Sequence, residues 1–222
     1  MSLAIFDLDN TLIGDDSDYL WGQFLVERGL VDGERYTREN QQFYEQYQAG
    51  TLDIDAFLTF MLRPLAEHPL AELLAWRAEF IEEKIRPILL PKAAALVEWH
   101  RAAGDTLLII TATNRFITAP IADLFSVASL LATEPEFIDG RYTGRSVGIP
   151  CFQQGKVTRL NQWLAETGHD LRGSRFYSDS HNDLPLLNQV AHPVAVDPDA
   201  ILADQAVERG WPILSLRGSE PI

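Results

Sequence analysis

The sequence predicts an α/β protein in which a doubly wound parallel sheet forms the core and a helical segment is inserted into it. From about residue 91 onward, short apolar runs alternate with helical patterns, which is typical of parallel strands joined by crossover helices. Residues 15–86 repeat their apolar positions at helical spacing only, directly after the first apolar run. We therefore assign 1–14 and 88–222 to a Rossmann-like core domain and 15–87 to a helical cap domain.

The first strand is predicted at Leu3 to Phe6, a short apolar run that ends before the first acidic residue. Three or four short helices are expected in the cap. Asp16 and Asp53 are predicted N-caps, and Pro64 and Pro69 are expected to break or start helices.

The core pattern resumes with a helix from Pro91 through His100. The remaining predicted elements are, in order, a strand from Thr106 to Ile110, a helix after Asn114, a strand near Ser129 to Ala132, a hairpin around Asp139-Gly140, a helix from Lys156 to Thr167, strands at Arg175 to Ser178 and Pro193 to Val196 with a helix near Leu186 between them, a helix from Asp199 and a last strand near Ile213.

The chain is acidic, with 18 Lys and Arg against 32 Asp and Glu and a net charge of -14. Its field repels polyanions, so we expect no nucleic-acid partner, and a phosphate-bearing substrate would need local cations or a bound metal. The single cysteine, Cys151, and the lack of any apolar run near 20 residues predict a cytoplasmic protein without a membrane span. The sequence leaves the oligomeric state open.

Polar residues follow three of the predicted strands, and in open α/β sheets binding sites form beyond the carboxyl ends of the strands. Asp7 and Asp9 lie two residues apart after the first strand, so on an extended chain their carboxylates point to the same side. Such a pair favours a bound cation or a shared proton. Asp, Asn and Thr are also common turn and cap formers, and taken alone this segment is more often structural.

Three further residues have two interpretations each, and a fourth, Asp179, has one. Thr111 would present its hydroxyl to an anion, or it caps the following helix. Lys156 begins a predicted helix, where the macrodipole disfavours a cation, so either an anion lies nearby or the residue is a solvated surface lysine. Asp179 is a candidate oxygen ligand for Mg²⁺, whereas Asp183 either joins it or caps the helix that Pro185 begins.

Together these segments resemble the haloacid dehalogenase superfamily of phosphatases. Asp7-Leu8-Asp9-Asn10-Thr11 matches the first signature of that superfamily, Thr111 the second, Lys156 the third and Asp179 with Asp183 the fourth. The resemblance spans nearly the whole chain. The helical insert is similar to the small cap of the phosphoserine phosphatase-like branch.

The resemblance implies a Mg²⁺-dependent hydrolase that acts on a small phosphate monoester. By resemblance, Asp7 is the nucleophile that forms an aspartyl-phosphate, and Asp9 is the general acid and base. The implied metal ligands are Asp7, Asp9 through its backbone carbonyl, and Asp179, with Asp183 as a further or outer ligand. The implied phosphate-binding residues are Thr111, Ala112 and Lys156.

The second and fourth signatures depart from those of phosphoserine phosphatases, which commonly have Ser-Gly-Gly and Gly-Asp-Gly-x-x-Asp. Here the corresponding segments are Thr111-Ala112-Thr113 and Ser178-Asp179-Ser180-His181-Asn182-Asp183. The Thr-Ala-Thr form and the segment Asp139-Gly140-Arg141-Tyr142-Thr143-Gly144 look more like a bacterial subgroup that includes histidinol-phosphate phosphatases. Histidinol phosphate is therefore the favoured substrate, with phosphoserine as an alternative.

Two other functions share these residues. A phosphotransferase would use the same nucleophile, and a non-catalytic, receiver-like module would bind Mg²⁺ or a phosphoryl group without turnover. Specificity is expected in the cap, because its opening and closure control access to the pocket. The conceivable cap contacts are Asp15, Asp16, Trp21, Arg63 and Arg86, each of which also has a capping, packing or surface-pairing interpretation.

Overall fold

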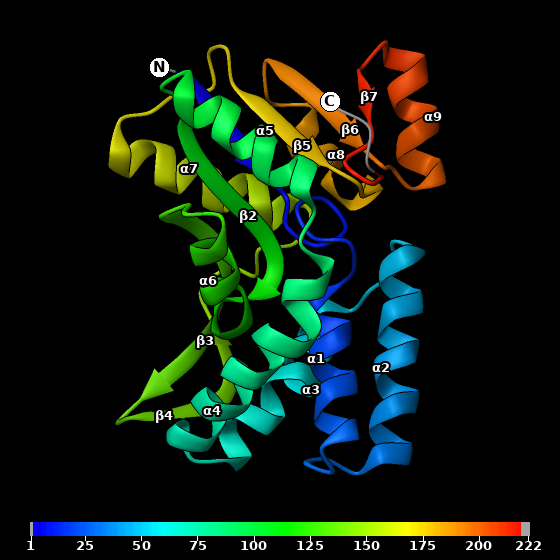
Figure 1. Cartoon of the computed structure of the whole chain (residues 1–222), viewed down its shortest axis with the longest axis vertical. Coiled ribbons are helices and arrows are strands. Elements are labelled where there is room, and N and C mark those ends of the chain that lie inside the picture. Colours follow the sequence, from blue (N-terminus) through cyan, green and yellow to red (C-terminus); the bar gives the residue numbers. More distant parts are fainter. Residues whose placement is uncertain (1, 219–222) are drawn as a thin grey trace.

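The computed structural model describes residues 2–218, and its strands form one sheet in the order β4-β3-β2-β1-β5-β6-β7 (Figure 1). All neighbouring strands pair in parallel except β3 and β4, which form an antiparallel hairpin. The strands are β1 Leu3–Phe6, β2 Thr106–Asn114, β3 Ser129–Ile138, β4 Arg141–Val147, β5 Arg175–Ser178, β6 His192–Val196 and β7 Ile213–Leu214. The predicted fold class is confirmed.

Helices cover both faces of the sheet, because side chains alternate between the two faces along each strand. In β1, Ala4 and Phe6 belong to the core that α5 (Pro91–Ala102) and α6 (Arg115–Leu124) cover. Leu3 and Ile5 pack in a second core on the opposite face, under α7 (Gln154–Thr167), α8 (Leu184–Leu187) and α9 (Ala200–Arg209). This double coverage leaves the carboxyl ends of the strands as the open edge of the core.

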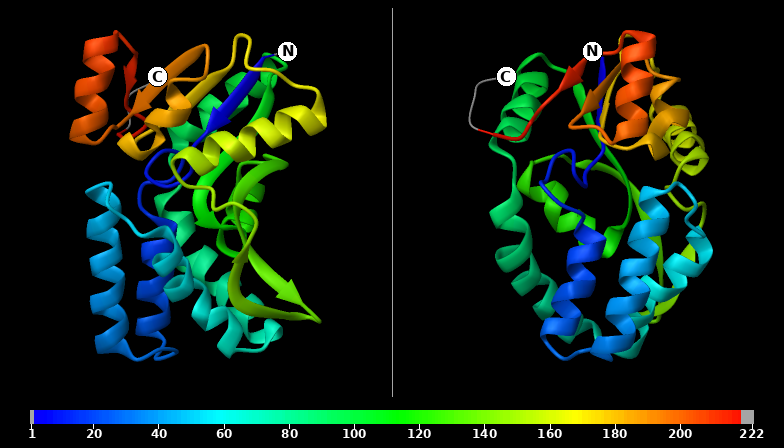
Figure 2. Two further views of the ribbon diagram at one scale, coloured as in Figure 1. Left: turned by 180° about the vertical axis from the view of Figure 1, so that it is seen from behind. Right: turned by 90° about the vertical axis from the view of Figure 1, so that its right-hand side faces the viewer.

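A group of helices follows β1 and lies beyond that edge (Figures 1 and 2). Its helices are α1 Ser17–Glu27, α2 Gly33–Gln48, α3 Ile54–Glu67 and α4 Leu70–Phe80, followed by a π-helical segment, η1 Ile81–Ile85, and a 3₁₀ turn, η2 Arg86–Ile88. Asp16 and Asp53 cap α1 and α3 as predicted. The prediction for Pro64 is wrong: it is a buried residue inside α3, and burial of its ring offsets the loss of one backbone hydrogen bond.

Two strands are longer than predicted. β2 continues from Ile110 to Asn114, with a register shift against β3 over this stretch, and β3 continues to Ile138. The predicted hairpin turn is confirmed, since Asp139 and Gly140 both have positive φ, at 50° and 81°. The β3–β4 hairpin packs against α3, so the core and the inserted helices share a surface. The division into 1–14 with 88–222 and 15–87 stays a prediction.

Within residues 2–218, none of the helices combines the length and the apolar character that a membrane crossing requires.

Candidate active site

A buried lysine joins the first and the fourth signature segments. Lys156 Nζ donates to Asp7 Oδ1 at 2.7 Å and to Asp183 Oδ2 at 2.8 Å, and all three side chains are at most 5% exposed. Burial lowers the pKa of Lys156, but the carboxylates of Asp183 and Asp7 together outweigh it and raise this pKa above its usual value. Lys156 is therefore a charged interior group and not a surface lysine.

The carboxylate of Asp183 faces the interior of the site. It accepts from Ser178 Oγ at 2.7 Å in addition to Lys156, and it makes no capping bond to α8. The interpretation of Asp183 as a helix cap is therefore not supported. Its hydrogen bonds to Lys156 and Ser178 indicate that it orients the lysine.

Asp7 and Asp179 meet from neighbouring strands at the open edge of the sheet. Asp179 Oδ1 accepts from Thr11 Oγ1 at 2.9 Å. Burial, followed by the charge of Asp7, raises the pKa of Asp179 well above its usual range. Burial also raises the pKa of Asp7 to about 7, with Lys156 opposing and Asp183 and Asp9 adding to the shift. Two carboxylates that disfavour each other's charge are stabilised by a cation between them.

Asp7 and Asp179 offer oxygen atoms as metal ligands, which suits a hard cation such as Mg²⁺ rather than zinc. In residues 2–218, no three His, Cys, Asp or Glu side chains gather as a metal cluster. Asp183 instead forms a salt bridge with Lys156. The expected set of two carboxylates, a backbone carbonyl and water does not need a third acidic side chain. The residues present therefore fit Mg²⁺.

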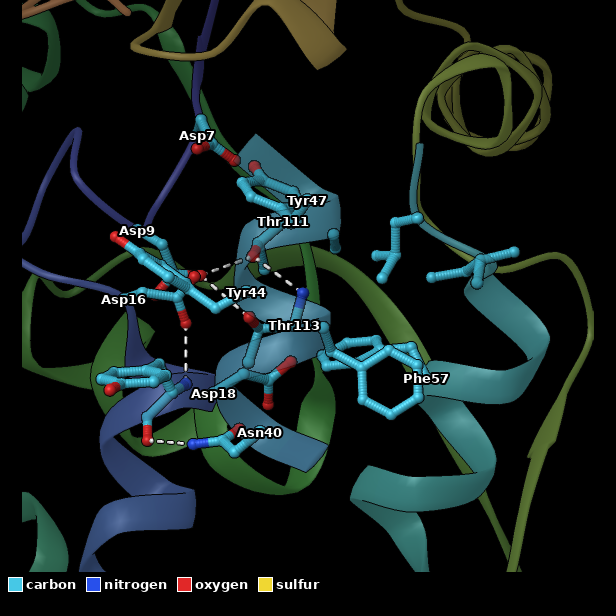
Figure 3. A pocket seen from close by; sticks show the side chains of 15 residues that line it. Asp7, Asp9, Asp16, Asp18, Asn40, Tyr44, Tyr47, Phe57, Thr111 and Thr113 are labelled. Atoms are coloured by element: carbon cyan, nitrogen blue, oxygen red, sulfur yellow. Dashed lines mark hydrogen bonds between the residues drawn. The ribbon is translucent and has the colours of Figure 1, made fainter. Parts of the chain in front are cut away.

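Asp9 is held between α1 and the end of β2 (Figure 3). Its Oδ1 accepts from the Ser17 backbone N–H at 2.7 Å, and its Oδ2 accepts from Thr113 Oγ1 at 2.9 Å and Thr111 Oγ1 at 3.3 Å. Asn114, and not Thr111, caps α6, since its Oδ1 accepts from the Ile117 N–H. The position of Asp9 is thus fixed by three donors from two separate segments.

A pocket opens beside Asp7, Asp9, Thr111 and Ala112. One side of it is a face of α2, whose residues Asn40, Phe43, Tyr44 and Tyr47 recur at helical spacing. In the view of Figure 3, Tyr47 and Tyr44 lie between Asp7 at the top and Asp18 below, and Phe57 lies at the right. The other lining residues are Asp16, Asp18, Tyr19, Leu52, Ile54 and Thr113.

Of the five predicted cap contacts, Asp16 lines this pocket. It also caps α1 by accepting from the Tyr19 N–H at 2.8 Å, and burial, followed by the charge of Asp9, raises its pKa to about 7. The other four are not among the residues that line the pocket. Their partners are structural: Asp15 accepts from the Asp16 N–H, Trp21 is fully buried against Phe24 and Phe80, Arg63 lies 3.9 Å from Glu39 and Glu67, and Arg86 pairs with Glu82.

Sequence reasoning missed Asp18 and the lining face of α2. Burial, followed by the charges of Asp16 and Asp9, raises the pKa of Asp18 well above its usual range. The signal for the α2 face was present in the spacing of Asn40, Phe43, Tyr44 and Tyr47, although such a stripe ordinarily indicates a core-facing helix.

Residues 4–188 match the family model of the haloacid dehalogenase-like hydrolases, and the chain belongs to this family. The superfamily predicted from the signatures is thereby confirmed.

Two relatives match along almost the whole chain. A histidinol-phosphatase from Neisseria meningitidis serogroup C is 50% identical over 220 residues, which cover 97% of this chain and 99% of that protein. A phosphoserine phosphatase from Mycobacterium tuberculosis is 33% identical over 219 residues, which cover 96% of this chain and 70% of that protein.

Solved structures agree with the fold. A Bordetella pertussis Tohama I protein of unknown function superposes with a TM-score of 0.92 at 48% identity, covering 97% of this chain and 99% of its own. A phospho-aspartyl intermediate analogue of phosphoserine phosphatase gives a TM-score of 0.72 at 15% identity, covering 97% and 93%. The second likeness concerns the fold alone.

Proposed function

We propose that the protein is a Mg²⁺-dependent phosphatase that hydrolyses a small phosphate monoester through an aspartyl-phosphate on Asp7. The observation that carries this proposal is that Lys156 contacts Asp7 and that Asp179 contacts Thr11, each across more than a hundred residues, while Asp7 and Asp9 line one pocket. Family membership and relatives named as phosphatases support the same reaction class.

In the first half of the proposed reaction, a carboxylate oxygen of Asp7 attacks phosphorus and the ester P–O bond breaks. Asp9 gives a proton to the leaving oxygen. In the second half, water attacks phosphorus, Asp9 takes a proton from that water, and the bond between phosphorus and Asp7 breaks to release phosphate. The bond from Lys156 to Asp7 Oδ1 orients the nucleophile and leaves Oδ2 for attack.

Bound Mg²⁺, held by Asp7, Asp179 and the backbone carbonyl of Asp9, would reduce the repulsion between the anionic nucleophile and the anionic phosphate. Thr113 and the Ser17 N–H aim the carboxyl of Asp9 toward the pocket, and Thr111 and Lys156 hold the phosphoryl oxygens.

The pocket favours histidinol phosphate over phosphoserine. Both substrates have an amine, but only phosphoserine has a carboxylate, which needs a cation. Among residues 2–218, the pocket lining contains no Lys or Arg, while it contains Asp16 and Asp18 and several aromatic rings. An amine and a flat imidazole suit such a lining, because carboxylates and aromatic faces both attract cations. The 50% identical histidinol-phosphatase supports the same choice.

The proposal is tested by assaying the purified protein with histidinol phosphate, phosphoserine and p-nitrophenyl phosphate, with Mg²⁺ and with EDTA. We expect turnover of histidinol phosphate and p-nitrophenyl phosphate that EDTA abolishes, and release of alcohol and inorganic phosphate in equal amounts. A shortfall of phosphate in the presence of an added alcohol would indicate a phosphotransferase. A folded protein without turnover would indicate a receiver-like module.

The variant Asp7→Asn should lose both turnover and the covalent phosphoenzyme, since the amide is a poor nucleophile. Wild-type rates in that variant would reject the assigned role of Asp7.

A further inference from the structure

The carboxylate of Asp18 lies inside the substrate pocket without a cationic partner. Asp18 is 5% exposed and sits in the first turn of α1, and Figure 3 shows its carboxyl pointing into the pocket on the side away from Asp7. In the part of the chain that the structure describes, no Lys, Arg or His pairs with it, because the interior lysine of the site is taken up by Asp7 and Asp183.

The side chains beside Asp18 are the neutral groups of Asn114 and Thr113, which bring no positive charge. Oδ1 accepts from Asn114 Nδ2 at 3.2 Å. The hydroxyl of Thr113 has a single proton, which it gives to Asp9 Oδ2 at 2.9 Å. The position of Asp18 near the positive end of the α1 dipole offsets a small part of the cost of burying a carboxylate. Among residues 2–218, the buried carboxylate of Asp18 therefore has neutral polar side chains beside it but no cation.

Asp16, the other acidic residue on this side of the pocket, already has a structural task. Its Oδ1 caps α1 through the Tyr19 N–H, whereas Asp18 makes no capping bond. The two carboxylates thus differ: Asp16 holds the start of the helix, and Asp18 makes no bond that the start of the helix needs.

We propose that Asp18 is the specificity-determining residue that binds the protonated amine of the substrate and so selects amino-alkyl phosphates over phosphate esters that lack the amine. This inference rests on the proposed phosphatase function and deepens it. Phe57 and the α2 face supply the apolar surroundings in which the contact between ammonium and carboxylate is strong.

The test compares histidinol phosphate with its des-amino analogue, which has the same imidazole and phosphate without the amine. For the wild-type protein we expect kcat/KM to favour the amine by about 10- to 100-fold, the range of one hydrogen bond to a charged group. In Asp18→Asn this preference should fall to about threefold or less, mainly through KM. The control is Asp55→Asn, the same change in the first turn of α3 at an exposed position, which should keep the full preference.

The outcomes separate the two proposals. An unchanged preference in a folded, active Asp18→Asn variant rejects the role of Asp18 and leaves the phosphatase function standing. Wild-type protein without turnover of any of these esters rejects the phosphatase function and this inference with it. If Asp18→Asn does not fold, Asp18→Glu decides: the longer side chain moves the charge, so an unaltered preference in that variant also rejects the proposal.

Discussion

Replacement of Lys156 by methionine tests the centre of the site most directly. Methionine keeps most of the length of the side chain but removes the ammonium that donates to Asp7 and Asp183. Two carboxylates would then remain buried at 5% exposure or less with no cation between them. Breaking a buried pair by removing one partner costs about 3–5 kcal/mol, a large share of the roughly 5–15 kcal/mol that stabilises a typical domain.

The matched control is Lys84→Met. Lys84 Nζ also pairs with a carboxylate, Glu27 Oε2 at 2.7 Å, but its side chain is 25% exposed and that of Glu27 is 54% exposed. Exposed pairs contribute about 0–1 kcal/mol, so this variant should unfold close to the wild type. The same replacement at the two positions thus differs mainly in burial.

Urea unfolding at pH 7.5 in EDTA measures both variants without metal. We expect the unfolding free energy of Lys156→Met to lie about 3 kcal/mol or more below that of Lys84→Met. With Mg²⁺ restored, kcat of Lys156→Met should fall about 100-fold or more, because a cation that stabilises transition-state charge is lost. Equal unfolding midpoints and equal kcat in the two variants would refute the interior role of Lys156.

Three further changes test other parts of the fold. Gly155→Ala would place a Cβ 2.0 Å from the Pro150 carbonyl oxygen, and since backbone cannot swing aside, we expect urea unfolding to show a loss of about 1–3 kcal/mol; an unaltered midpoint would contradict the contact. Gly22→Ala would place a Cβ 2.6 Å from Asn40 Nδ2, which can rotate away, and the gain in helix propensity of about 1 kcal/mol should leave stability nearly unchanged. Because Asn40 lines the pocket, we expect KM to rise. An unchanged KM would argue that Asn40 does not contact the substrate. Burial lowers the pKa of His100, so below about pH 6.5 the unfolded chain binds a proton that the folded chain does not, and stability should fall from pH 7.5 to 5.5. His100→Gln should reduce this pH dependence of the unfolding free energy, which for one proton is at most about 1.4 kcal/mol per pH unit. An identical pH dependence in the variant would show that His100 does not contribute.

The fold and the chemical end of the site could be predicted because both follow from local pattern. Asp7, Thr111 and Asp179 each follow an apolar run, and parallel strands bring their carboxyl ends to one edge. Lys156 was identifiable because a cation at the start of α7 is disfavoured by the helix dipole. In the structure, two buried carboxylates, those of Asp7 and Asp183, stabilise this cation.

The substrate end could not be predicted, because it depends on how separate elements pack. Asn40 and Tyr44 lie on a largely polar helix, and only the cover provided by neighbouring elements turns that face into a pocket wall. Thr113 holds Asp9 because β2 runs past Ile110, a length that apolar content alone did not indicate. For Trp21 the sequence left both a ligand contact and core packing open, and the side chain fills the core.

The acidity of the chain and the polarity of the pocket lead to one more expectation. A net charge of -14 repels a phosphate dianion, and salt weakens that repulsion as the Debye length falls from about 30 Å at 0.01 M to about 10 Å at 0.1 M. The amine of histidinol phosphate offsets part of its charge, whereas p-nitrophenyl phosphate has no cation. We therefore expect kcat/KM for p-nitrophenyl phosphate to rise with KCl at fixed saturating Mg²⁺, and kcat/KM for histidinol phosphate to rise less or to fall as salt screens its amine from Asp18 and Asp16. Parallel salt dependence of the two substrates would show that the acidic side of the pocket does not meet the amine.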